Sequence, residues 1–185
     1  MTEMTLEDVI VRVVPSSGEP PELADERVRV VLLREAAGAR RLPIWIGAAE
    51  GDALALQLGG EALPRPLTPD LMARLLEAAG ARVERVTIAS LSEHTFFATI
   101  AIAVGGDSRE VDARPSDALN LAARVRAPIY VDDDVLERAG IASDELDREL
   151  DELRERIGME EGAPGEWQSL SPELVKSLHP VPGKK

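Results

Sequence analysis

DARPSDA, residues 112–118, joins the end of an expected strand to the start of an expected helix. Pro115 suits the first position of a helix, where its missing N–H group has no intrahelical partner in any case. A carboxylate in the first turn, as at Asp117, is stabilised by the positive end of the helix dipole. Apolar residues follow at helical spacing and predict a buried face: Ala118, Leu121, Ala122 and Val125. Four polar residues are thereby expected at one strand-to-helix junction: Asp112, Arg114, Ser116 and Asp117.

A second helix is expected to begin in the same way, within PRPLTPD at residues 64–70. Thr68 is predicted as its N-cap, Pro69 as its first residue and Asp70 as an acid in its first turn. Apolar residues recur at helical spacing before a terminating glycine: Met72, Leu75, Leu76 and Ala79. Two helix starts that each carry an arginine and an acid are more than packing alone requires.

The other elements follow from hydrophobic periodicity and turn residues. Strands are predicted over 6–14, 28–34, 41–46, 83–88, 95–104, 109–113 and 128–131, and further helices over 48–58 and 132–139, with a loop over 15–21. This set predicts the α+β class, with residues 5–142 as one compact domain of mixed or antiparallel strands with three or four helices.

The C-terminal part of the chain has a different composition. Residues 143–158 are predicted as an acidic helix with a short apolar seam: Leu146, Leu150, Leu153 and Ile157. That seam would pack either on the domain or on a second subunit. Residues 159–185 are rich in Pro, Gly and Ser and are expected to form a disordered tail, with Trp167 as its large anchor.

Composition limits the possible functions. The 185 residues suit one domain with a tail, and the lack of cysteine excludes disulfides and thiolate chemistry. No signal peptide is recognised, and no apolar run approaches the roughly 20 residues of a membrane span. A cytoplasmic protein that does not contact the membrane is therefore expected.

The net charge of −13 is concentrated in residues 132–161, which hold 13 acidic residues and four arginines. Nucleic-acid binding is expected to be weak, since phosphate contacts need a positive surface. Residues 1–131 use arginine for every cation. Arginine suits bidentate phosphate contacts, although a biased genome composition would give the same usage.

Five blocks of the chain, in this order, resemble the bifunctional nuclease domain, a family of bacteria and plants. They are RRLPIWIGAAEGDALAL (40–56), PRPLTPDLMARLLEAAGA (64–81), TFFATI (95–100), VDARPSDALNLAARVRAPIYV (111–131) and DVLERAGI (134–141). The resemblance implies a compact α+β domain that self-associates and degrades DNA and RNA. The chain departs from the family at Pro69, where a histidine is common. This departure either removes a general base or indicates that the histidine is not essential.

Phosphodiester hydrolysis needs a nucleophilic water and stabilisation of charge on the phosphoryl oxygens. The candidate catalytic carboxylates are Glu50, Asp70, Asp112 and Asp117. Asp112 and Asp117 are also the candidate ligands of Mg²⁺ or Mn²⁺. The candidate phosphate-binding residues are Arg65, Thr68, Arg114 and Ser116.

Each candidate also has a purely structural interpretation. The acids at the two helix starts can serve the helix dipole, the arginines can pair with those acids, and Glu50 can cap its own helix. His94 and His179 are interpreted as incidental, and the absence of nucleotide-binding and zinc motifs predicts that no organic cofactor is used.

Two functions remain open on the sequence. The first is a nuclease acting on DNA or RNA, assembled as a homo-oligomer and most simply a dimer. The second is a non-catalytic regulatory module that binds an anion or a protein. Carboxylates that converge within about 5 Å on an open pocket would favour metal chemistry, whereas Arg65 and Arg114 each buried in a pair with an acid would favour a structural role.

Overall fold

A computed structural model of the chain describes residues 1–14, 22–23, 28–36, 38, 40–142, 148–150, 152–153 and 166–178. Its strands are β1 (Thr2–Val14), β2 (Glu22–Leu23), β3 (Val28–Glu35), β4 (Arg41–Gly47), β5 (Ala81–Ser92), β6 (Thr95–Val104), β7 (Asp107–Ala113), β8 (Ile129–Val131) and β9 (Glu166–Ser169). Its helices are α1 (Ala48–Leu58), α2 (Thr68–Ala78), α3 (Pro115–Val125), α4 (Asp133–Ala139) and α6 (Pro172–Leu178). The predicted loop over 15–21 lies outside the described residues.

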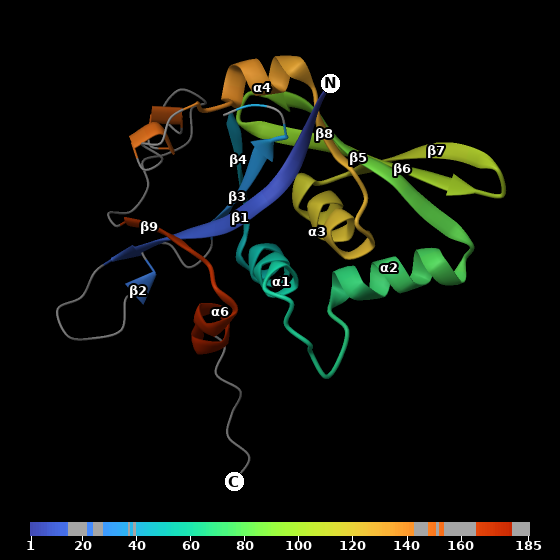
Figure 1. The fold of residues 1–185 in the computed structure, drawn as a ribbon, viewed down its shortest axis with the longest axis horizontal. Helices are drawn as coiled ribbons and strands as arrows, with labels where there is room; N and C mark the ends of the chain where they lie inside the picture. The colour runs from blue at the N-terminus through green and yellow to red at the C-terminus, as the bar shows by residue number, and fades with distance from the viewer. Residues whose placement is uncertain are drawn as a thin grey trace, which may run out of the picture.

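The described strands form one sheet in the order β4-β3-β1-β8-β5-β6-β7, with β2 and β9 both paired to β1. β5 and β8 run parallel, and β8 is antiparallel to β1, so this short strand joins two antiparallel halves. Helix α1 contacts β1, β3 and β4, whereas α3 contacts β4, β5 and β6 (Figure 1). The predicted α+β class with mixed strands is confirmed, and α3 lies against both halves of the sheet.

Several predicted bounds match the structure, but several strands are longer than predicted. β1 begins at Thr2 and not at residue 6, and β7 begins at Asp107 and not at residue 109. The helix expected over 48–58 and the strand expected over 95–104 have those bounds as α1 and β6. β5 runs Ala81–Ser92, beyond the predicted 83–88. Its pairing with β6 shifts register at Val83/Arg85 and at Ile88/Ser90. Such bulges break the alternation on which the prediction relied.

Helix α3 buries the face that its sequence predicts. Ala118, Leu121 and Ala122 are all buried, together with Leu119. The prediction for Val125 is wrong, because this side chain is 38% exposed. Val125 is the last helical residue, and the next residue leaves the helix in the left-handed conformation. The end of the helix therefore lies beyond the sheet that it covers.

Helix α2 differs from its prediction in its cap and in its packing. Its N-cap is Leu67 and not Thr68, because the Asp70 carboxylate accepts the Leu67 N–H at 2.7 Å. α2 has no buried residue, and Leu75, predicted on the apolar face, is 59% exposed. Met72 and Leu76 are half-buried against the core. α2 packs on α3 and β5, and it therefore covers less of the core than α1 and α3 do.

The C-terminal residues also differ from their prediction. Within the tail expected to be disordered, β9 pairs with β1 and α6 packs on α1. Leu170 and Val175 are 2% and 3% exposed, and Trp167 lies 4.9 Å from the Arg12 guanidinium carbon. These apolar and cation–π contacts anchor the segment on the domain.

Part of the predicted acidic helix is also described. Residues 148–150 and 152–153 are helical, with Leu150 and Leu153 buried in the core, whereas Leu146 and Ile157 lie outside the described residues. The described part of the seam thus packs on the domain. No helix in the described part of the chain is long and apolar enough to cross a membrane.

Candidate functional site

The starts of α1 and α3 meet at one guanidinium. Arg114, the N-cap of α3, donates from Nε and Nη2 to Asp117 at 2.8 and 3.0 Å, and from Nη2 to Glu50 at 2.9 Å. Glu50 lies in the first turn of α1, and Asp117 lies in the first turn of α3. The fold therefore brings two carboxylates from two helix starts to one cation. We call Glu50, Arg114 and Asp117 the Arg114 cluster.

The Arg114 cluster is paired but open to solvent. The Arg114 side chain is 66% exposed, and those of Glu50 and Asp117 are 26% and 34% exposed. Hydrogen bonds to Asp117 and then to Glu50 raise the pKa of Arg114 above its ordinary value. Exposed ion pairs contribute little to stability, so they rearrange at little cost. The Arg114 guanidinium is therefore accessible from solvent.

A pocket of about 460 Å³ opens between α1, α2 and α3, and we call it the helix pocket. Its wall includes the whole Arg114 cluster together with Thr68 and Pro69 from the start of α2. Four sequence candidates, Glu50, Thr68, Arg114 and Asp117, are thus brought to one cavity. Two carboxylates and an exposed, paired arginine thus line one open pocket.

Arg65 and Asp70 line a separate, neighbouring pocket of about 190 Å³. Leu56 and Leu67 lie in the walls of both this pocket and the helix pocket. Arg65 is exposed on the chain that leads into α2, and it faces the same cavity as Arg124. Arg65 and Arg114 therefore lie in adjacent pockets, although the start of α2 contributes residues to both.

Asp70 serves the start of its own helix. It accepts hydrogen bonds from the Leu67 N–H and from the Arg124 guanidinium. Burial alone would raise the pKa of Asp70, but these two hydrogen bonds outweigh it and hold the pKa below its ordinary value. The helix-end interpretation of Asp70 thus has direct support in its contacts.

Asp70→Asn is expected to destabilise the protein by about 1 kcal/mol at neutral pH, the typical contribution of a helix cap. A lowered folded-state pKa stabilises the protein above the unfolded-state pKa, and this contribution is lost as the pH falls through the folded-state pKa. The two proteins should therefore converge in stability in acid. Thermal unfolding of both from neutral pH to pH 3 measures this difference. A constant difference would show that the charge of Asp70 is not responsible.

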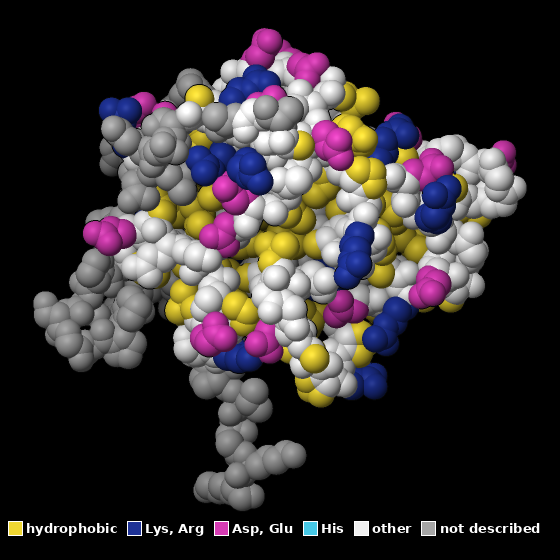
Figure 2. All heavy atoms as spheres, in the orientation of Figure 1, with side chains coloured by type: hydrophobic (Ala, Val, Ile, Leu, Met, Phe, Trp, Pro, Cys, Tyr) yellow, Lys and Arg dark blue, Asp and Glu magenta, His cyan; other side chains and the backbone are white. Residues whose placement is uncertain are grey.

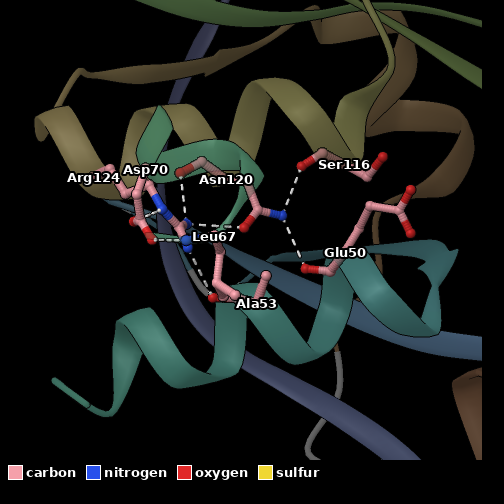
Figure 3. Close-up of polar contacts among 7 residues, drawn as sticks. All are labelled: Glu50, Ala53, Leu67, Asp70, Ser116, Asn120 and Arg124. Carbon is pink, nitrogen blue, oxygen red and sulfur yellow. Dashed lines mark hydrogen bonds and ion pairs between the residues drawn. The ribbon is translucent and has the colours of Figure 1, made fainter. Parts of the chain in front are cut away.

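Two residues of this region were not predicted as functional. Asn120, which is fully buried, donates from Nδ2 to the carbonyl oxygens of Glu50 and Ser116 at 2.9 Å (Figure 3). Arg124, whose side chain is 6% exposed, contacts the carbonyl oxygens of Ala53 and Asn120 as well as Asp70. Both come from α3 and tie it to α1 and to the start of α2, which fixes where Glu50 lies. By helical spacing, Asn120 and Arg124 share the polar face of α3 with Ser116 and Asp117, so the hydrophobic pattern carried no signal that they are buried.

Ser116 and Asp112 lie away from the helix pocket. Ser116 is 6% exposed and lines a third pocket of about 300 Å³, which Arg114 also borders. Asp112 is exposed on β7, opposite Thr99 of β6, and lines none of these three pockets. Of the four polar residues expected together at this junction, Arg114 and Asp117 meet in the helix pocket. Ser116 lines the neighbouring third pocket, and Asp112 lines none of the three.

The described residues contain no group of three Asp, Glu, His or Cys side chains placed to hold a metal ion. Two carboxylates, Glu50 and Asp117, do meet at Arg114. Mg²⁺ commonly uses one or two carboxylates and keeps several waters, so an oxygen pair of this kind suits it. Glu50 and Asp117 are therefore brought together at one site, whereas Asp112, the other expected ligand, lines none of the three pockets.

A sequence model of the bifunctional nuclease domain matches residues 31–144. The chain belongs to the bifunctional nuclease domain family. The matched range includes β4, α1, α2 and α3, which contribute residues to the three pockets. The resemblance read from the five sequence blocks is confirmed.

Relatives of this bifunctional nuclease domain include two proteins from two strains of Mycobacterium tuberculosis, both titled as uncharacterized. Each is 47% identical over 121 residues, which cover 65% of this chain and 72% of the relative. Pro69, where the resemblance implies a histidine in other members, lies in the wall of the helix pocket. Pro69 and the Arg114 cluster therefore border the same cavity.

Proposed function

We propose that this bifunctional nuclease domain hydrolyses phosphodiester bonds of DNA or RNA at the helix pocket. The observation that carries the proposal is the Arg114 cluster, in which two carboxylates and one exposed arginine line an open pocket. Phosphoryl chemistry uses these groups, because a guanidinium binds and neutralises the phosphate and a carboxylate accepts a proton from water. Family membership supports the same chemistry.

Substrate binding would begin with an exchange of partners at Arg114. As a phosphate approaches, the guanidinium turns from a carboxylate to the phosphoryl oxygens. The carboxylate released, Glu50 or Asp117, is then placed to take the proton of the attacking water. In a metal-assisted version, Glu50 and Asp117 would instead hold Mg²⁺ or Mn²⁺, which would supply charge neutralisation and a more acidic bound water. Asn120 holds the first turn of α1 through the Glu50 carbonyl and so keeps the cluster together.

The surface charge predicts weak binding of nucleic acid. The net charge is −13, and on the face drawn in Figure 2 positive and negative side chains are interspersed without a broad positive patch. Long-range attraction of a polyanion is therefore small, and binding depends on local contacts such as those of Arg114. We propose nucleic acid as a weakly bound substrate.

A non-catalytic module that binds an anion is the second candidate. Pro69 favours it, because a side chain without acid–base capacity stands in the pocket wall where the family commonly has histidine. In that case Arg114 would bind a phosphate or carboxylate group without turnover.

Self-association and location in the cytoplasm are also proposals. Leucines are exposed at the end of α1, before α2 and on α2, and they support self-association: Leu58, Leu63, Leu71 and Leu75. A homodimer is the simplest assembly that would cover them. Light scattering of the purified protein measures its mass directly.

Incubation of the purified protein with labelled single-stranded DNA or RNA tests the activity. Cleavage is expected with Mg²⁺ or Mn²⁺ and is expected to stop in EDTA. Cleavage that persists in EDTA would contradict the requirement for a metal ion, although the protein would still be a nuclease. No cleavage with either metal, together with retained anion binding, would establish the non-catalytic alternative.

A further inference from the structure

The third pocket is not used by the chemistry above, except at Arg114. It has a volume of about 300 Å³, and we call it the Trp45 pocket. The end of β4, the turn between β5 and β6 and the start of α3 form its wall: Ile44, Trp45, Ile46, Gly47, His94, Thr95, Phe96, Arg114, Pro115 and Ser116. Three segments that lie far apart in the sequence thus build one cavity beside the Arg114 cluster.

We propose that the Trp45 pocket binds an unpaired nucleobase of the nucleic-acid strand whose phosphate lies at Arg114. This inference rests on the proposed function and names the class of its substrate. The nucleobase is the part of a nucleotide that matches an aromatic wall, whereas the phosphate matches the neighbouring cation.

Two aromatic side chains lie in the wall of the Trp45 pocket. Trp45 is half-buried on β4, and Phe96, at the start of β6, is 8% exposed. Base stacking on such side chains tolerates any sequence, because every base has a π face. Aromatic residues make up 3% of this chain, so two of them in one small pocket are a concentration that a generic surface would not have.

Polar groups in the same wall favour a nucleotide over a purely apolar ligand. His94 is exposed at the tip of the β5–β6 hairpin, next to Thr95, and both face this pocket. Their side chains can hydrogen-bond the polar edge of a base. A volume of about 300 Å³ is at the small end of ligand sites, which suits one base and excludes a duplex.

Arg114 connects this pocket to the proposed chemistry. Its side chain lines both the Trp45 pocket and the helix pocket, where Glu50 and Asp117 lie. A base in the first pocket places the adjoining phosphate near Arg114 and the two carboxylates. Paired bases are stacked inside the duplex and enter such a pocket only after costly extrusion. The geometry therefore selects single strands over duplexes.

Binding in EDTA tests the base pocket without any need for cleavage. The chain has two tryptophans, so Trp167→Phe leaves Trp45 as the fluorescent reporter. Single-stranded oligo(dT) is expected to quench this fluorescence, and a hairpin duplex of equal charge is expected to quench it far less. Thymidine monophosphate is expected to quench weakly, since it supplies a base with one phosphate only.

Substitutions of Trp45 separate stacking from simple packing. Trp45→Leu should weaken oligo(dT) binding about tenfold, because stacking on an aromatic ring is lost. Trp45→Phe should keep most of the affinity, and His94→Ala, on the exposed turn, should weaken binding without affecting the fold. Fluorescence anisotropy of a dye-labelled oligo(dT) reports these affinities, and circular dichroism confirms that each variant is folded.

The outcomes distinguish the base pocket from the proposed function. Absence of quenching by oligo(dT), equal binding of the duplex, or wild-type affinity in folded Trp45→Leu would overturn the base pocket. If Trp45→Leu does not fold, the quenching of Trp45 fluorescence and the affinity of His94→Ala decide whether the base pocket exists. Binding that follows this pattern with no cleavage under any metal would overturn the nuclease alone, since the base pocket would stand.

Discussion

Arg114→Ala is expected to slow cleavage of single-stranded DNA about a hundredfold, the typical effect of removing one group that stabilises transition-state charge. Arg114 is the cation of its cluster, and its guanidinium contacts both candidate carboxylates. The substitution removes the phosphate contact and leaves Glu50 and Asp117 to repel the substrate. Single-turnover rates at saturating metal measure the loss.

A matched control for this substitution is Arg82→Ala. The Arg82 side chain is 75% exposed on β5 and lies in none of the three pockets. Arg82→Ala removes the same charge from the surface as Arg114→Ala, so the two variants share any long-range electrostatic effect. Equal losses in the two variants would contradict a specific role of Arg114. The melting temperatures of Arg114→Ala and Arg82→Ala should stay close to that of the wild type, because the ion pairs of both arginines are exposed to solvent.

Asp52→Ala is expected to lower the free energy of unfolding by about 3 kcal/mol, because it removes one partner of a buried ion pair. Arg29 of β3 and Asp52 of α1 are 2% and 7% exposed at their side chains, and Arg29 Nε donates to Asp52 Oδ1 at 2.9 Å. The Arg29 cation would stay in a nearly dry environment without the carboxylate that neutralises it. Urea unfolding at neutral pH gives the difference.

The double variant Arg29→Met, Asp52→Leu is the control for this prediction. It removes both charges and fills a similar volume with apolar atoms, which is often close to neutral for buried pairs. Its stability is therefore expected to exceed that of Asp52→Ala. If Asp52→Ala is as stable as the wild type, the ion pair of Arg29 and Asp52 does not stabilise the fold. Asp52 also lines the helix pocket, so this pair holds part of the pocket wall in place.

Local chemistry made much of the fold predictable. Pro115 marks the start of α3, and Gly47, the last residue of β4, marks the change from strand to helix. Both boundaries hold in the structure. These signals act over a few residues, so the sequence contains them directly. The predictions that Val125 and Leu75 are buried are wrong, because burial depends on which part of a helix another element packs against. Helical periodicity does not indicate where that packing ends.

The candidate site was predictable only in part, for the same reason. Arg114 and Asp117 are three residues apart, and their pairing follows from helix geometry. Glu50 joins them from 64 residues away, and Asn120 reaches the Glu50 carbonyl across 70 residues. Such contacts depend on how α1 packs against α3. Asn120 lies on the polar face of α3 in the sequence pattern, so only the packing of α1 on that face shows that it is buried and which carbonyl it contacts.

The central claim is that the Arg114 cluster carries out phosphodiester cleavage. The measurement that tests it most directly is the rate of single-stranded DNA cleavage with Mn²⁺ by Asp117→Asn beside Asp112→Asn, both shown to be folded. Asp117→Asn should lose about a hundredfold in rate, as expected for a proton acceptor, while Asp112→Asn, exposed on β7, should cleave like the wild type. Equal loss in both variants, or loss in Asp112→Asn alone, would contradict the account.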